Sequence, residues 1–243
     1  MCIGAATSMF PFISCLPDQP LVREVKLAMA PDVFADMQEC LANHPLTGGA
    51  VLGQTAFAKT RGFVIAFNRE GIEQFKHDVR FECLYPYFER AVLEEANAWV
   101  LNLLICHEPT YASDVVVRLH LDDTLRTHWI FHSWLAHQVN VLYVTVPQDM
   151  MGGWLQVWNY NRKPSQKRTH DMNSPDHTVT PEENTMIAFR GDSFHRVMGY
   201  TTRTNTKRIS LVLEQYQVAA LFYPFTETFG FYRKDDMDVS EMM

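Results

Sequence analysis

The sequence predicts one α+β domain in which a β-barrel is backed by N-terminal helices. Apolar residues recur at helical spacing in much of the first half of the chain. From Val115 onward, short segments rich in β-branched and aromatic residues alternate with clusters of glycine, proline, asparagine and aspartate. Helices followed by a run of short strands are typical of α+β domains. The 243 residues, 47% of them hydrophobic, are enough to bury one large core.

The first half of the chain is predicted to support the barrel. Pro31 has the fixed φ that suits a first helical turn, and Phe34 and Met37 follow on one apolar stripe. Pro86 falls inside a second helical pattern, so we expect a kink there. The predicted elements are a strand at 21–29, a helix from Pro31 to Asn43, strands at 50–59 and 62–67, and a helix at about 78–104.

The second half is predicted to form the β core. We divide the domain into a helical and strand support at 1–114, a core at 115–217 and a C-terminal tail at 218–243. The polar stretch 160–173 is expected to be a surface loop, and the charged end of the tail is expected to fray. The predicted core strands lie at 115–122, 139–146, 152–158, up to 180, 186–197 and 207–213.

Charge and cysteine content exclude several classes of protein. With 28 acidic and 21 basic residues, the net charge of −7 disfavours nucleic-acid binding. There is no basic stretch before the apolar N-terminus and no apolar run long enough for a bilayer, so we predict neither a signal peptide nor a membrane span. We therefore predict a cytoplasmic protein with reduced thiols and without a disulfide framework or structural zinc site, because the five cysteines are scattered: Cys2, Cys15, Cys40, Cys83 and Cys106.

Two histidines and one aspartate stand out at the ends of predicted strands. His120 and Asp122 are two residues apart, so on a strand their side chains share one face, and Arg118 is expected on the same face. His195 follows the turn after a later apolar strand and can supply a third ligand if that strand lies across the barrel. Two imidazoles and one carboxylate leave further metal positions open, which suits non-haem Fe(II) and oxygen chemistry.

An arginine in the last predicted strand suggests an anion site. Arg208 and Ser210 share one face of a strand otherwise made of isoleucine, leucine and valine. This setting favours burial, and a buried arginine needs an anion. A guanidinium beside a hydroxyl can bind a carboxylate through paired hydrogen bonds. A surface salt bridge is the alternative interpretation of Arg208.

Over roughly 115–217, the chain resembles the 2-oxoglutarate- and Fe(II)-dependent oxygenases, especially the branch similar to prolyl-4-hydroxylases. The resemblance rests on several matched motifs in the order in which that family has them. They are His120-Leu-Asp122, the strand around Leu142-Tyr143, the Gly152-Gly153-Trp-Leu stretch, His195, and Arg208-x-Ser210.

This resemblance implies a double-stranded β-helix, the jelly-roll or cupin-like barrel, with Fe(II) held by His120, Asp122 and His195. It implies that Arg208, Ser210 and Tyr143 bind the co-substrate 2-oxoglutarate. The reaction with O2 would release succinate and CO2 and hydroxylate an unactivated C–H bond of a small molecule, such as an amino acid or a biosynthetic intermediate. Desaturation and ring closure stay open, although the carboxylate ligand favours hydroxylation. The alternatives are a peptidyl or protein hydroxylase, and a cupin-like metal-binding protein without 2-oxoglutarate turnover.

The segment 123–138 departs from the family pattern. It is rich in aromatic residues and histidines, and it could be a lid over the site or an element packed on the barrel. His128, His132, His137 and Asp123 are competing ligands, but His128 and His132 lack a carboxylate at the right offset, and Asp123 would need a bulge. The expected assembly is a monomer or homodimer, with a small-molecule substrate as the only predicted partner.

Overall fold

The computed structural model describes residues 21–46, 56–106, 114–125, 134–159, 174–204 and 206–232. The predictions made for the loop 160–173, the end of the tail, most of the strand 50–59, and His128 and His132 lie outside these residues.

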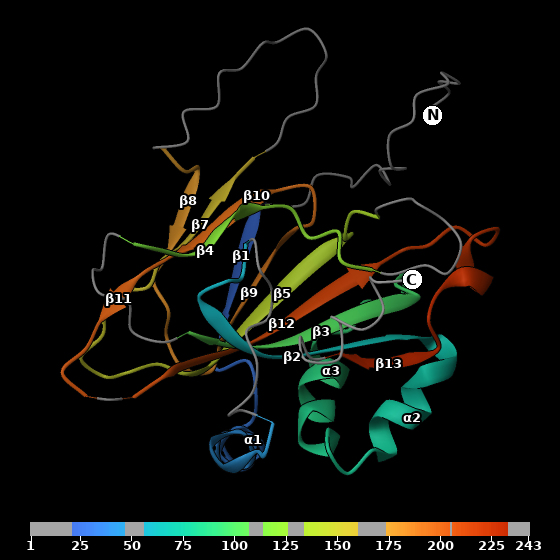
Figure 1. Ribbon diagram of the computed structural model, residues 1–243, viewed down its shortest axis with the longest axis horizontal. Coiled ribbons are helices and arrows are strands. Elements are labelled where there is room, and N and C mark those ends of the chain that lie inside the picture. The colour runs from blue at the N-terminus through green and yellow to red at the C-terminus, as the bar shows by residue number, and fades with distance from the viewer. Residues whose placement is uncertain are drawn as a thin grey trace, which may run out of the picture.

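A seven-stranded antiparallel sheet forms the centre of the structure (Figure 1). Both neighbours of β3 are antiparallel to it, β12 on one side and β2 on the other. The N-terminal half therefore contributes central strands rather than only a support. In spatial order the strands are β1 (Val22–Lys26), β9 (Thr185–Arg190), β5 (Gln138–Thr145), β12 (Arg208–Tyr216), β3 (Ala98–Cys106), β2 (Thr60–Asn68) and β13 (Phe229–Tyr232).

Two smaller antiparallel sheets complete the β structure. One has four strands in the order β4 (Val115–His120), β10 (Phe194–Met198), β7 (Leu155–Trp158) and β8 (His177–Val179). The other pairs β6 (Met151–Gly152) with β11 (Tyr200–Thr201). One buried apolar cluster joins side chains of the large sheet, such as Val100 and Val141, to side chains of the four-stranded sheet, such as Val117 and Val157. The functional residues described below lie between these two sheets.

Three α-helices lie beside the opposite face of the large sheet (Figure 1). The helix predicted from Pro31 is confirmed as α1 (Pro31–Asn43), and the Gln38 side chain donates to the Val144 carbonyl of β5 over 2.6 Å. The others are α2 (Ile72–His77) and α3 (Tyr85–Ala91), and short 3-10 turns lie at η1 (Arg69–Gly71), η2 (Glu82–Leu84) and η3 (Tyr223–Phe225). Because strand residues alternate, Leu101 and Leu103 of β3 pack in this helix-side cluster.

The predicted helix over 78–104 is wrong. Only Tyr85–Ala91 of that range is α-helical, with Pro86 in its first turn, and Ala98–Cys106 is the strand β3. Eight of the nine β3 residues are buried, because helices cover one side of the sheet and the second sheet covers the other. A strand buried on both faces has no polar alternation, so its apolar run imitates a buried helix.

Cys40 of α1 and Cys83 of η2 form a disulfide, so the prediction of reduced thiols is wrong for this pair. The two residues are 43 positions apart, and no motif marks them as partners, so only the folded packing of α1 against η2 reveals the pair. Cys106 is a buried free thiol.

Reducing this disulfide should lower the free energy of unfolding by about 2–4 kcal/mol, because the bond closes a long loop in the unfolded chain. The measurement is urea unfolding with and without reductant. The Cys40→Ser/Cys83→Ser double variant is the control, and its midpoint should not respond to reductant. Equal midpoints for the parent protein under both conditions would contradict the expected contribution.

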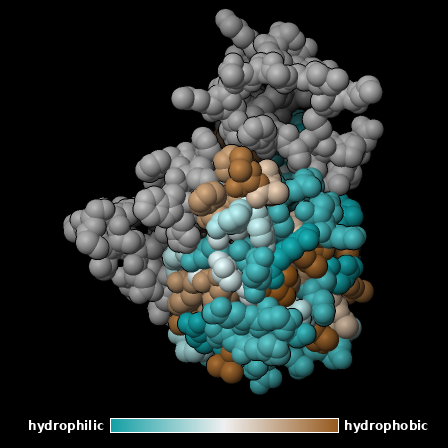
Figure 2. All heavy atoms as spheres, turned by 90° about the vertical axis from the view of Figure 1, so that its right-hand side faces the viewer, coloured by the Kyte–Doolittle hydropathy of each residue, from teal (hydrophilic) through white to brown (hydrophobic). Residues whose placement is uncertain are grey.

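Hydrophilic residues predominate on the face shown in Figure 2, with hydrophobic residues scattered among them. Isolated exposed apolar side chains are ordinary and do not define an interface. No helix in the described ranges is long and apolar enough to cross a bilayer.

Candidate functional site

The site begins where β4 and β10 pair in the four-stranded sheet. His195 of β10 lies directly opposite His120 of β4, and their ring centres are 4.1 Å apart. The next paired positions are Val197 and Val117, so β4 has one residue more than β10 in this interval. This bulge places Val117 and His120 on one cavity wall and leaves Arg118 exposed, contrary to the face expected for Arg118 from regular alternation.

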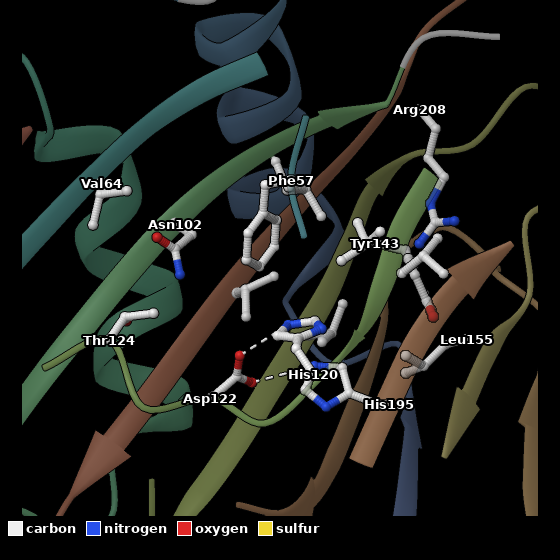
Figure 3. A pocket seen from close by; sticks show the side chains of 15 residues that line it. Phe57, Val64, Asn102, His120, Asp122, Thr124, Tyr143, Leu155, His195 and Arg208 are labelled. Atoms are coloured by element: carbon white, nitrogen blue, oxygen red, sulfur yellow. Dashed lines mark ion pairs between the residues drawn. The ribbon is translucent and has the colours of Figure 1, made fainter. Parts of the chain in front are cut away.

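Asp122 follows the end of β4 and points between the two histidines (Figure 3). Its Oδ1 lies 3.2 Å from His120 Nε2, and its Oδ2 lies 3.4 Å from His195 Nε2. The side chain is buried, and Oδ2 accepts no hydrogen bond from the described residues. Potential ligand atoms of the three residues all lie within 4.8 Å of one another, so they can reach one metal ion.

Backbone carbonyls set the tautomer of both imidazoles. His120 Nδ1 lies 2.7 Å from the Arg118 carbonyl oxygen, and His195 Nδ1 lies 3.2 Å from that of Ser193. A carbonyl only accepts, so each Nδ1 carries the proton and donates it. In the neutral rings this leaves both Nε2 lone pairs directed at the site, the arrangement found in metal-binding histidines.

The charges of the site suit a metal ion. Burial acts to lower the pKa of His120, but the hydrogen bond and the charge of Asp122 outweigh it and the pKa rises, so a metal would take the place of a proton there. Burial lowers the pKa of His195 to about 4, which keeps this imidazole neutral and able to act as a ligand. Burial acts to raise the pKa of Asp122, but the neighbouring His195 and His120 outweigh it and the pKa falls. The result is one carboxylate beside two imidazole nitrogens, a donor set that suits Fe(II).

These residues open onto a cavity of about 110 Å³ between the two sheets (Figure 3). Most of its wall is apolar, and the Phe57 ring meets His120 edge-on with 4.9 Å between centres. An apolar wall of this kind restricts water around the site and leaves the few polar groups to orient a ligand. The lining residues are Phe57, Val64, Asn102, Leu104, Val117, His120, Asp122, Thr124, Val141, Tyr143, Leu155, His195, Val197, Arg208 and Val212.

Arg208 occupies one end of this cavity and is only 1% exposed. Its Nη1 donates to the Gly153 carbonyl over 2.6 Å, and its guanidinium lies 5.1 Å from the centre of the Tyr143 ring. No carboxylate of the described residues forms an ion pair with Arg208. A buried cation without an anion is costly, so this end of the cavity is suited to a negatively charged ligand.

Three buried polar atoms at this end have no hydrogen-bond partner among the described residues: Arg208 Nε, Tyr143 OH and Ser210 Oγ. Ser210 pairs with Tyr143 across β12 and β5, two residues from Arg208 on the same face of β12. Burial raises the pKa of Tyr143 to about 12, so its hydroxyl keeps its proton and can donate it. Native proteins rarely leave several such atoms unpaired, and all three are donors of the kind from which a carboxylate accepts hydrogen bonds.

The structure thus brings five of the six predicted site residues to one cavity and places Ser210 beside them. Asp123, the competing ligand, is exposed and does not line the cavity. His137, also in the segment 123–138, lies 3.6 Å from Glu95 Oε1 and is likewise absent from the cavity wall.

Sequence reasoning missed a buried carboxyl group behind the other end of the cavity, where Asn102 and Thr124 line the wall. Glu214 is 1% exposed and accepts hydrogen bonds from Thr124 Oγ1 at 2.6 Å, from Asn102 Nδ2 at 2.8 Å, and from the Tyr216 hydroxyl. Burial first, and then the charge of Asp122, raise the pKa of Glu214 to about 8. The sequence could have indicated Glu214, because it follows Arg208 by an even number of residues on one strand and alternation then puts both side chains on the same face.

No protein-family model and no curated sequence matches the chain. Among solved structures, it is similar to a prolyl-4-hydroxylase from Pseudomonas putida, with 14% identity and a TM-score of 0.47 over 82% of this chain and 94% of that one. A 2OG-Fe(II) oxygenase family protein from Burkholderia pseudomallei gives 14% identity and 0.46 over 82% and 86%. A dioxygenase for auxin oxidation from Arabidopsis thaliana gives 12% identity and 0.48 over 83% and 90%. The solved structures that this chain resembles thus include 2-oxoglutarate and Fe(II) oxygenases, a prolyl-4-hydroxylase among them.

Proposed function

We propose that this protein is an Fe(II)- and 2-oxoglutarate-dependent oxygenase with a double-stranded β-helix fold, which hydroxylates a C–H bond of a small molecule. The observation that carries the proposal is the pairing of two sites in one cavity. Two imidazoles and a carboxylate converge within metal-binding distance, and a buried arginine without an anion lies at one end of the same cavity. A metal site alone would not need that arginine.

His120, Asp122 and His195 would hold Fe(II), and Arg208, Ser210 and Tyr143 would hold the distal carboxylate of 2-oxoglutarate. The bound iron would supply the activation of O2 that is coupled to the decarboxylation of the co-substrate to succinate and CO2. The protein contributes position and environment. The Arg118 and Ser193 carbonyls orient the imidazoles, and Gly153 orients the guanidinium.

The apolar wall of the cavity supports a small substrate with a hydrocarbon portion. Phe57, Val64 and Val212 line it away from Arg208 and can pack on such a group. Packing would position one C–H bond near the three metal ligands and restrict water there.

The first test is anaerobic addition of Fe(II) and then 2-oxoglutarate, which should give the visible metal-to-ligand charge-transfer band of the chelate. His120→Ala should lose the band. The matched control is His177→Ala, which removes an exposed histidine of β8 outside the cavity and should keep it. A folded parent protein that binds iron without developing a band would contradict the use of 2-oxoglutarate and favour a metal-binding cupin.

Gly153→Ala should weaken 2-oxoglutarate binding by roughly tenfold, because the change disturbs Arg208. Gly153 has φ +72°, and an added Cβ would lie 3.0 Å from Met150 Cε and 3.4 Å from Arg208 Nη1. The positive φ itself should cost about 1–2 kcal/mol of stability. The measurement is a 2-oxoglutarate titration of the charge-transfer band.

Gly152→Ala is the control for that strain. Gly152 also has a positive φ of 93°, but no hydrogen bond joins it to Arg208. Gly152→Ala should therefore lose stability and keep its affinity for 2-oxoglutarate. Equal losses of affinity in both variants would show that Gly153 does not act through Arg208.

A further inference from the structure

The cavity has a second polar end, on the opposite side of the metal ligands from Arg208. Figure 3 shows Asn102 and Thr124 on one side of the histidines and Asp122, and Arg208 and Tyr143 on the other. β12 runs along the cavity, and alternation puts Arg208 and Glu214 on the same face of this strand. Six residues of a strand span roughly 20 Å, so these two charged residues mark separate ends.

Glu214 has no cationic partner among the described residues. Its three hydrogen-bond donors, Asn102, Thr124 and Tyr216, are all neutral. Neutral donors compensate a buried negative charge only in part, and burial together with the charge of Asp122 raises the pKa of Glu214 to about 8. A positive charge nearby would therefore stabilise the ionised form of Glu214. This end of the cavity is the electrostatic counterpart of the Arg208 end, which favours a negative charge.

Asn102 connects Glu214 to the cavity. Its Nδ2 donates to Glu214 Oε1, so the amide is oriented with its nitrogen toward the carboxyl group. Its Oδ1 has no hydrogen-bond donor among the described residues, and the side chain lines the cavity wall. A cationic ligand in the cavity can therefore donate an N–H to Asn102 Oδ1, and its positive charge would favour the ionised form of Glu214 behind that amide.

We propose that Asn102 and Glu214 recognise a protonated amine on the substrate and make the protein selective for amine-bearing small molecules. The assignment as a substrate site rests on the proposed function, in which the Arg208 end is taken by 2-oxoglutarate. The apolar side chains of Phe57, Val64 and Val212 would pack on the hydrocarbon portion of that substrate. The amine would then hold the carbon chain between Glu214 and the metal ligands.

The test compares three probes that share an isopentyl group and differ in the head group: isopentylamine, isopentanol and isocaproate. Binding of each to the full chain without added metal is measured by ligand-observed NMR. The parent protein should bind the amine at least about tenfold more tightly than the alcohol, as expected for a charged hydrogen bond. Isocaproate should bind at the Arg208 end instead, so its affinity should respond to Arg208→Ala and not to Glu214→Gln. Equal affinities for the amine and the alcohol would overturn the inference.

Two variants each remove one buried carboxyl group, Glu214 behind the cavity wall or Asp122 on it. Glu214→Gln should reduce the amine preference to within about twofold, whereas Asp122→Asn should keep it. The reverse result would mean that the amine binds at the metal ligands, and the inference would be abandoned. If circular dichroism shows that Glu214→Gln does not fold, Asn102→Leu replaces it and should lose the preference in the same way.

Iron and 2-oxoglutarate binding by the same proteins separates this inference from the proposed function. Glu214→Gln should keep the charge-transfer band, and in the parent protein the amine should perturb that band more than the alcohol does. A band without amine preference would remove the substrate inference alone. An amine preference that depends on Glu214, without any band, would support the amine site and remove the proposed oxygenase function.

Discussion

Asp122→Ala is expected to abolish 2-oxoglutarate turnover and to weaken Fe(II) binding by more than about a hundredfold. Loss of an outer partner of a metal ligand already costs about 10–100-fold, and this change removes a ligand itself. Asp122 is also the carboxylate that lies within 3.4 Å of both imidazole Nε2 atoms, so the variant keeps only neutral donors at that point. Metal affinity is measured by anaerobic titration, and turnover by succinate release.

Asp123→Ala is the matched control, because it removes the neighbouring carboxylate. Asp123 is exposed and lies outside the cavity wall, so this variant should retain metal binding and turnover. Full activity in Asp122→Ala would rule out the proposed ligand set. Loss of activity in Asp123→Ala alone would also rule it out and would assign the carboxylate ligand to Asp123. Circular dichroism of both variants separates a lost ligand from a lost fold.

The candidate ligands could be chosen from the sequence because local rules suffice there. A histidine and an aspartate two residues apart at a strand end already share a region of space, and Arg208 and Ser210 share a strand face by alternation. Local rules cannot predict the distance between His195 and the pair His120 and Asp122. It depends on the pairing of β10 with β4, which joins segments about 75 residues apart in the sequence.

The errors have the same origin, since each involves contacts between distant segments. Ala98–Cys106 has the apolar pattern of a buried helix because both faces of this strand are buried. One face is covered by the four-stranded sheet, and this packing cannot be predicted from the local sequence. The exposed position of Arg118 follows from a bulge that appears only when β4 is paired. Cys40 and Cys83 meet only because α1 packs beside η2. Glu214 alone was within reach of local reasoning, through its even spacing from Arg208.

Arg208→Ala should raise the 2-oxoglutarate concentration needed for half-saturation by roughly thirty- to several-thousandfold while leaving Fe(II) binding nearly intact. Removing one member of a buried, hydrogen-bonded charge pair costs about 2–5 kcal/mol, which corresponds to this range. Arg208→Lys keeps the charge but loses the planar fork, so an intermediate loss is expected. Titration of the charge-transfer band measures the requirement directly.

The control for charge is Arg196→Ala. Arg196 lies on β10 of the four-stranded sheet, where it donates to Gln156 Oε1 over 2.7 Å and stacks on Trp158, and it does not line the cavity. This variant should keep the parental requirement for 2-oxoglutarate. An unchanged requirement in Arg208→Ala would remove Arg208 from the co-substrate site.

Thermal unfolding tests the role of Arg208 independently of the charge-transfer band. Without ligand, the guanidinium is buried with no anion among the described residues. Its removal loses one hydrogen bond and one contact with an aromatic ring, but it also removes an uncompensated buried charge. The melting temperature of ligand-free Arg208→Ala should therefore stay close to that of the parent. Addition of 2-oxoglutarate to the Fe(II)-loaded proteins should then stabilise the parent and not the variant, because only a ligand that binds the folded state raises its stability. If the ligand-free variant is strongly destabilised instead, Arg208 is a structural residue, and the cavity end that it forms has no anion to bind.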